Sequence, residues 1–231
     1  MIPFLSHLDL LGLAVFLLCW AGYALVADRI PAIRARSVIA AMDEHRRRWL
    51  VSTLPKENRI ADVAIVGNLM SSTSFLANTC IFIIGGLMAL LASPEVGRRV
   101  LESVPFAQTG LSDGGWEARI LLLLLIFVRT FFELTWALRQ FNYGSILIGA
   151  FPRDAANGLP AAEIAARVVN RAARHFNTGL RAYYFGLAAL AWILHPVALM
   201  LASLWVVAEL HRREFRSAVR QAVIEGEEQQ R

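Results

Sequence analysis

The chain has 231 residues, of which 57% are hydrophobic, and its mean hydropathy is +0.51. This composition excludes an ordinary soluble domain, because the apolar residues form long blocks that match the thickness of a bilayer. The formal charge of +5 comes from basic residues clustered between these blocks, which is typical of segments held at an anionic membrane surface. We therefore expect a single membrane domain over residues 1–231 that binds no nucleic acid.

The first apolar block predicts a membrane span over residues 8–27, interrupted only by Asp9 at its outer end. No basic segment precedes it, and Leu25 stands where a signal peptidase requires a small residue, so we expect the span to be retained. The arginine-rich segment that follows carries apolar residues at helical spacing. It predicts an amphipathic helix over residues 37–53 at the cytoplasmic surface of the membrane, with Ser37 as its N-cap.

The second span is predicted over residues 64–92, and one face of this helix carries small and polar residues. These residues recur at steps of three, four or seven: Gly67, Ser71, Ser74, Asn78 and Gly85. Small residues at this spacing let a second helix approach closely, and Asn78 can donate a hydrogen bond across such a contact. We favour helix packing for this face and keep the lining of a ligand site as the alternative.

The third span is predicted over residues 117–142 and carries Arg129 and Glu133 near its middle. A charged side chain at the centre of a spanning helix costs roughly 2.5 to 3.5 kcal/mol, so two of them require a protein or wet environment. The two residues are four apart and can pair on their own helix. A structural ion pair and a role in permeation, proton relay or ligand binding both remain open.

After a turn-rich break, a second basic amphipathic helix is predicted over residues 160–176, with Pro160 at its first turn. The fourth span is predicted over residues 181–208, where the dipeptide His195-Pro196 should kink the helix. Residues 209–231 predict a charged tail at the surface. The fold class is therefore all-α: a polytopic bundle of four transmembrane helices with basic amphipathic interfacial helices.

The distribution of basic residues predicts the orientation of this bundle. The first and third connections are rich in arginine, whereas no basic residue precedes residue 8, so these connections should face the cytoplasm. Four spans then place both termini outside. We expect a multi-pass protein of the cell membrane, here a bacterial inner membrane.

Matching residue depths from the span midpoints places Arg129 and His195 at one level, with Asn78 and Glu133 close by. These four residues could form one polar layer that opens inward. His195 has no histidine partner at its depth, so a membrane haem is not expected, and we predict no cofactor. We expect no enzyme, because no nucleotide-binding loop, zinc motif or nucleophile elbow is present.

Three strings together resemble the bacterial and plant membrane family catalogued as domain of unknown function 599. They are Asn68-x-Met70-x-Ser72-Thr73-x-x-Leu76-Ala77, then Arg139-Gln-Phe-Asn142, then Gly179-Leu-Arg-Ala-Tyr-Tyr-Phe185. The resemblance spans most of the chain. It implies a four-helix integral membrane protein and no particular activity.

Polar residues of these strings should gather at the cytoplasmic ends of the second, third and fourth spans. The residues are Asn68, Ser72, Arg139, Asn142, Asn177 and Arg181. Such a ring would suit a helix-capping network, which we favour, or a site for an anion or lipid headgroup.

Two functions from different classes fit these features. The first is an oligomeric channel or carrier for an ion or small solute, lined or gated by Arg129 and Glu133; it requires assembly because four helices rarely enclose a pathway. The second is a non-catalytic scaffold or accessory subunit whose basic helices bind anionic lipid headgroups or a partner complex. We favour the first and expect a homo-oligomer.

Overall fold

The computed structural model describes residues 5–105, 107–108, 111–152 and 155–228, and every regular element within them is an α-helix. The all-α prediction is therefore confirmed. In chain order the helices are α1 (His7–Arg29), α2 (Pro31–Arg34), α3 (Val38–Ser52), α4 (Ile60–Ala92), α5 (Pro94–Glu102), α6 (Asp113–Gly149), α7 (Ala155–Leu194), α8 (Pro196–Phe215) and α9 (Ala218–Glu228).

Serine caps begin three of these helices. Ser6 and Asp9 form a capping box at the start of α1, in which each side chain accepts a hydrogen bond from the other residue's backbone. The Ser37 side chain accepts from the backbone N–H of Ala40, which confirms the predicted cap of α3. Ser112 caps α6 in the same way.

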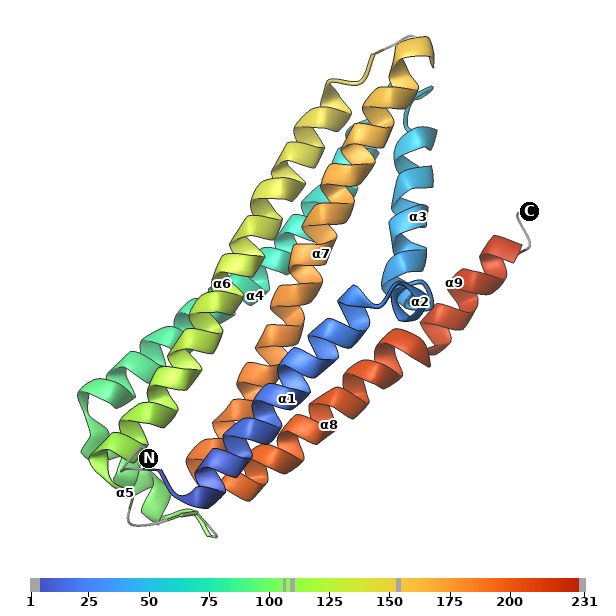
Figure 1. Cartoon of the computed structure of the whole chain (residues 1–231). Coiled ribbons are helices and arrows are strands. Elements are labelled where there is room, and N and C mark those ends of the chain that lie inside the picture. The colour runs from blue at the N-terminus through green and yellow to red at the C-terminus, as the bar shows by residue number, and fades with distance from the viewer. Residues whose placement is uncertain (1–4, 106, 109–110, 153–154, 229–231) are drawn as a thin grey trace.

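Three long helices run through the whole molecule. The helices α4, α6 and α7 contain 33, 37 and 40 residues, which correspond to lengths of about 50 to 60 Å, roughly twice the hydrocarbon thickness of a bilayer. Helix α6 packs along both others, and α6 and α7 run antiparallel (Figure 1). Each long helix therefore contributes to two separate bundles.

The first bundle, here called the membrane half, contains α1, α8 and one end of each long helix. Large rings fill its core: Phe16, Trp116, Phe127, Phe185 and Trp192 are each no more than 1% exposed. Gly186 lets α7 approach α6 closely, since a Cβ atom there would lie 2.9 Å from the Phe127 ring.

The second bundle, here called the basic half, contains α3 and the opposite ends of α4, α6 and α7. Helix α7 contributes mainly alanines to its core, which are Ala162, Ala165, Ala166, Ala172 and Ala173. These small side chains pack against Leu50 of α3 and Phe141 of α6. Because alanine permits a short distance between helix axes, the basic half is narrow and closely packed.

Three helices are long and apolar enough to cross a membrane: His7–Ala27, Ile60–Ala92 and Asp113–Gly149. They coincide with the first three predicted spans, although the second starts four residues earlier than predicted and the third extends beyond both predicted ends. The protein thus has the helices of a membrane protein, as the sequence indicates.

The predicted fourth span over residues 181–208 is wrong, because the chain reverses direction within it. Helix α7 ends at Leu194, His195 is extended, and α8 starts at Pro196 and returns beside α7 (Figure 1). Arg181 and Glu214 pair across the two helices, which requires an antiparallel arrangement. The backbone N–H group at the first position of a helix has no partner within that helix, so a proline there loses no hydrogen bond. Pro196 therefore begins α8 instead of kinking α7.

The two predicted interfacial helices are not confirmed as separate elements at a surface. Residues 160–176 form part of α7, which begins at Ala155, so Pro160 lies inside a helix rather than at its start. The helix over residues 37–53 exists as α3 but runs lengthwise beside α7 (Figure 1). Both segments build the core of the basic half.

The reversal at His195 also changes the positions of the chain ends. Helix α9 packs against α3 in the basic half, and Arg220 Nε donates to the carbonyl oxygen of Arg36 at 2.5 Å. Helix α1 starts at the opposite end of the molecule (Figure 1). Helix α9 therefore does not lie beside the start of α1, and the placement of both termini outside a membrane stays a prediction. Of the predicted tail, residues 209–215 extend α8, 218–228 form α9, and 229–231 lie outside the described residues.

Candidate functional site

Arg129 and Glu133 pair on their own helix, as predicted, but they do not form a buried polar layer. Their side chains approach to 3.6 Å and are 58% and 21% exposed. Glu133 makes a shorter contact of 2.9 Å with His175 of α7, a partner that sequence reasoning did not identify. His195 lies away from them, at the turn between α7 and α8, where its Nδ1 accepts from the backbone of Val197.

The small-residue face of α4 points away from the rest of the chain. Asn78 is exposed, and a Cβ atom added at Gly67 or Gly85 would meet no atom within 4 Å. The structure therefore brings Asn78 close to neither Arg129 nor His195. In the part of the chain that the structure describes, no helix packs against the predicted helix-packing face.

A buried polar cluster that the sequence analysis missed lies at the end of the membrane half where α1 starts. Arg119 Nη2 donates to Asp9 at 2.8 Å and to Gln108 at 2.9 Å, and Trp192 Nε1 donates to Asp9 at 2.9 Å. The Arg119 guanidinium also lies over the Trp192 ring, at 5.4 Å. In the sequence, Asp9 and Arg119 carry opposite charges, and each lies near the start of an apolar segment. This pattern is the feature from which the pair could have been predicted.

The predicted ring of polar residues is divided in the structure. Asn68, Arg139 and Asn142 are exposed, and Arg139 donates to the Tyr143 hydroxyl on its own helix. Arg181 is different: it is buried and makes a bidentate ion pair with Glu214 of α8, at 2.8 and 3.0 Å. Arg181 also borders the most basic cavity in the described part of the molecule.

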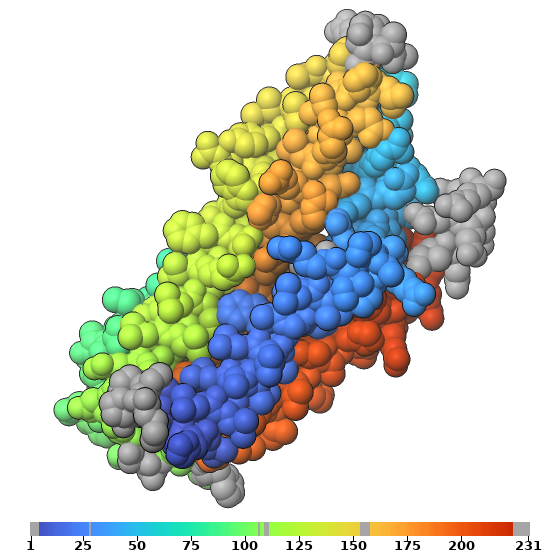
Figure 2. Space-filling view, in the orientation of Figure 1, coloured from blue at the N-terminus to red at the C-terminus, as the bar shows by residue number. Residues whose placement is uncertain are grey.

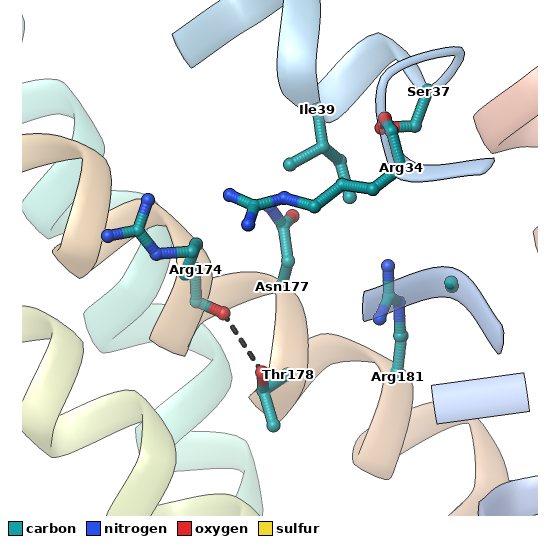
Figure 3. A pocket seen from close by; sticks show the side chains of 8 residues that line it. Arg34, Ser37, Ile39, Arg174, Asn177, Thr178 and Arg181 are labelled. Atoms are coloured by element: carbon teal, nitrogen blue, oxygen red, sulfur yellow. Dashed lines mark hydrogen bonds between the residues drawn. The ribbon is translucent and has the colours of Figure 1, made fainter. Parts of the chain in front are cut away.

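This basic cavity has a volume of about 200 Å³ and lies where α1 ends and α2 and α3 begin. Four of its lining residues follow one face of α7 at steps of three, four and seven: Arg174, Asn177, Thr178 and Arg181. Figure 3 shows Arg34 extending toward these residues from the other wall. Ala27, Ser37 and Ile39 complete the lining.

Beside this cavity, the single carboxylate of Asp43 lies close to three guanidinium groups. Asp43 contacts Arg46 at 2.5 Å, whereas Arg34 and Arg174 lie at 3.5 and 3.7 Å from it. Burial lowers the pKa of Arg46 and its pairing with Asp43 opposes that shift, so Arg46 remains charged. Arg181 is neutralised by Glu214. Among the described side chains, the three arginines around Asp43 therefore carry two positive charges more than that single carboxylate offsets.

Two further hollows border the basic cavity along α7. An apolar cavity of about 240 Å³ shares Ile39 and Asn177 with it and includes Ser72. The second, here called the lateral groove, shares Thr178 and Arg181 and is lined by α1, α6 and α7. Its remaining lining residues are Trp20, Tyr23, Ala24, Arg129, Ala182 and Phe185. Figure 2 shows α7 (orange) exposed between α1 (blue) and α6 (yellow-green).

The chemistry that this arrangement offers is the binding of an anion. Among the described residues, no group of three or more histidine, cysteine, aspartate or glutamate side chains could hold a metal ion. Guanidinium groups bind phosphate and carboxylate oxygens through paired N–H donors. The sequence analysis named Arg181 but did not bring it together with Arg34 and Arg174.

A comparison with protein families gives one match: the model described as "Protein of unknown function, DUF599" matches residues 11–219. No curated protein and no solved structure matches the chain.

Proposed function

The chain belongs to the DUF599 family, as its three motifs indicated, and from that premise we propose that it is a non-catalytic membrane scaffold that binds anionic lipid headgroups at the cytoplasmic surface. The observation that carries this proposal is the contrast between the two halves of the molecule. The core of the membrane half is filled with large rings, while positive charge collects at and beyond its inner end.

Helix lengths support a specific placement in the bilayer. A helix crosses the hydrocarbon core in about 20 residues. Counted from the buried polar cluster, that distance leads from Asp9 to Arg29 in α1 and from Arg119 to Arg139 in α6. Each count ends at an arginine, and arginines are typical of the cytoplasmic boundary.

This placement puts the basic half in the cytoplasm, together with α9 at the C-terminal end, and leaves the start of α1 outside. Exposed arginines of the basic half then face the inner leaflet or a partner that carries negative charge. They include Arg167 and Arg171. Each such side chain near an anionic surface contributes about 1 kcal/mol of attraction.

The filled core supports a scaffold over a pathway through one subunit. Phe16, Trp20 and Phe185 form a group of contacting rings, with centroids 5.6 to 6.0 Å apart, at the centre of the membrane half. A permeation path in such a bundle requires polar side chains that line water. Arg129 instead lies at the lateral groove and is 58% exposed.

The test is lipid selectivity measured on the purified full-length protein. Native mass spectrometry should find anionic phospholipid retained in preference to phosphatidylcholine, and raised salt during purification should reduce the retained amount. Equal retention of anionic and zwitterionic lipids at low salt would contradict the proposal.

A second candidate, an oligomeric channel or carrier, is supported by one observation. The small-residue face of α4 exposes Asn78 within an apolar helix, and an amide group facing lipid is unfavourable unless another helix supplies a partner. Under this proposal, copies of the chain assemble through α4 and solute passes between them. Liposomes that contain the protein should then show ion or solute flux above protein-free liposomes, and native mass spectrometry should show more than one 25.6 kDa subunit.

A further inference from the structure

We infer that the basic cavity binds a phosphate monoester, and that the adjoining lateral groove makes the headgroup of a membrane lipid its source. The inference rests on the proposed function for the position of the membrane. It goes further in naming one site and one class of ligand.

Charge complementarity supports a dianion. Arg34, Arg46 and Arg174 share the single carboxylate of Asp43, so two positive charges remain in excess among the described side chains. A phosphate monoester carries a charge of about −1.5 to −2 at neutral pH, whereas the phosphodiester of an ordinary phospholipid carries one negative charge. The excess therefore matches the monoester.

The guanidinium groups of Arg34 and Arg174 are placed to accept this ligand. The short contact of Asp43 is with Arg46, while Arg34 and Arg174 approach it only to 3.5 and 3.7 Å. Their side chains are 41% and 44% exposed, so incoming oxygens can reach both of them. A phosphate oxygen can replace the long contacts with shorter, charge-assisted ones.

Arg181 supplies a fixed wall of the site. Its bidentate pair with Glu214 and its position 5.5 Å from the Tyr23 ring hold the guanidinium in one orientation. Because Arg181 lies about two turns further along the same face of α7 as Arg174, the two cations border the cavity from a rigid element. A site whose donors are already oriented loses less entropy on binding.

The size of the cavity favours a compact ligand. Its volume of about 200 Å³ lies below the range of roughly 300 to 1,000 Å³ that is typical of pockets for drug-sized molecules. A phosphate group fits these limits better than a nucleotide does. The side-chain amide of Asn177 lies on the same wall and can donate a further hydrogen bond, whereas the Thr178 hydroxyl already donates to the carbonyl oxygen of Arg174 at 3.0 Å.

The lateral groove provides the route for a lipid. It continues from the basic cavity through Thr178 and Arg181 toward the level of Arg129, between α1 and α6. Trp20 and Ala24, both partly exposed, give it an apolar lining against which an acyl chain can lie. A lipid of the inner leaflet could therefore place its headgroup in the cavity without leaving the bilayer.

The experiment measures ligand binding to the full-length protein in detergent by native mass spectrometry. The probes are phosphatidic acid, phosphatidylcholine and inorganic phosphate. Phosphatidic acid should bind at least about tenfold more tightly than phosphatidylcholine, and Arg34→Gln with Arg174→Gln should weaken it by about tenfold or more. The unliganded double variant should melt within a few degrees of the parent, because both side chains are half exposed.

Arg47→Gln with Arg48→Gln is the matched control. It also removes two positive charges, from side chains of similar exposure at 44% and 37% in the same basic half. The control should bind phosphatidic acid within about twofold of the parent. If the control loses as much affinity for phosphatidic acid as the cavity variant does, the lipid binds to the positive charge of the basic half in general. That result would refute the site at the basic cavity and leave the scaffold proposal standing. If phosphatidic acid binds no more tightly than phosphatidylcholine, both the cavity site and the scaffold proposal are refuted.

A third variant distinguishes the two sources of phosphate. Ala24→Phe fills the lateral groove without changing the charge of the cavity, so it should weaken phosphatidic acid and leave inorganic phosphate unchanged. If inorganic phosphate binds the parent as tightly as phosphatidic acid does, and Ala24→Phe changes neither, the lipid part of the inference is overturned.

Discussion

Replacement of Arg119 should destabilise the protein far more than replacement of Arg129, ten residues later on the same helix. The Arg119 side chain is fully buried and its guanidinium contacts Asp9, Gln108 and Trp192. Arg119→Met removes these contacts and leaves the Asp9 carboxylate, 4% exposed, without its cation. Breaking a buried pair in this way costs about 3 to 5 kcal/mol of the free energy of unfolding.

Arg129 makes a longer contact with Glu133 and is more than half exposed. Ion pairs of this kind contribute about 0 to 1 kcal/mol. At roughly 2 to 4 °C per kcal/mol for a chain of this size, Arg119→Met should lower the melting temperature by about 10 °C, and Arg129→Met by no more than about 4 °C. Thermal unfolding of each variant in the same detergent, followed by tryptophan fluorescence, gives the comparison.

The double variant with Asp9→Asn and Arg119→Met completes the test. Asparagine removes the charge and keeps one oxygen that can accept from Trp192, while its amide nitrogen takes the place of Oδ2 and can donate to the Ser6 hydroxyl instead of accepting from it. Among the described residues, Nε and Nη1 of Arg119 have no hydrogen-bond partner to lose. The double variant should therefore recover most of the lost stability. If Arg119→Met and Arg129→Met melt at equal temperatures, the burial argument is refuted.

Two further predictions test helix packing and chain direction. Gly186→Ala should lower the free energy of unfolding by about 1 to 3 kcal/mol because its Cβ would press on a buried ring, whereas Gly85→Ala, which meets no atom within 4 Å, should be neutral or stabilising in the same melting assay. The second prediction uses single cysteines in a cysteine-free background and an impermeant thiol reagent. The reagent should label Ser52→Cys and Val219→Cys from the same side of the membrane and Ser103→Cys from the other side. Labelling of Val219→Cys from the same side as Ser103→Cys would contradict the reversal at His195.

The first three spans could be predicted because each is a single apolar run of bilayer length. The fourth could not, because hydropathy measures composition and carries no information about direction. His195-Pro196 satisfies the requirements of a kink and of a new helix equally well. The pairing of Arg181 with Glu214 distinguishes the two outcomes, and a pair 33 residues apart is visible only in three dimensions.

The sequence predicts a membrane-surface position for the segment 160–176 because its larger apolar residues form a stripe along one face. In the structure Ile164 is 45% exposed, and the buried face consists mainly of alanines. Alanine contributes little to a hydrophobic pattern, yet it decides where two helices can meet. The basic cavity could not be predicted from the sequence either, because Arg34 and Arg174 come together only after α3 folds back along α7.

The continuity of α4, α6 and α7 has a mechanical consequence. A bilayer that differs in thickness from the apolar length of a helix changes the tilt of that helix. For a rigid rod that extends about 30 Å beyond the hydrocarbon core, a tilt of about 10° moves the far end by roughly 5 Å. Helix α1 ends at Arg29 and does not share this lever arm. Under the proposed placement, we therefore expect a change in bilayer thickness to move the far ends of α4, α6 and α7 relative to α1.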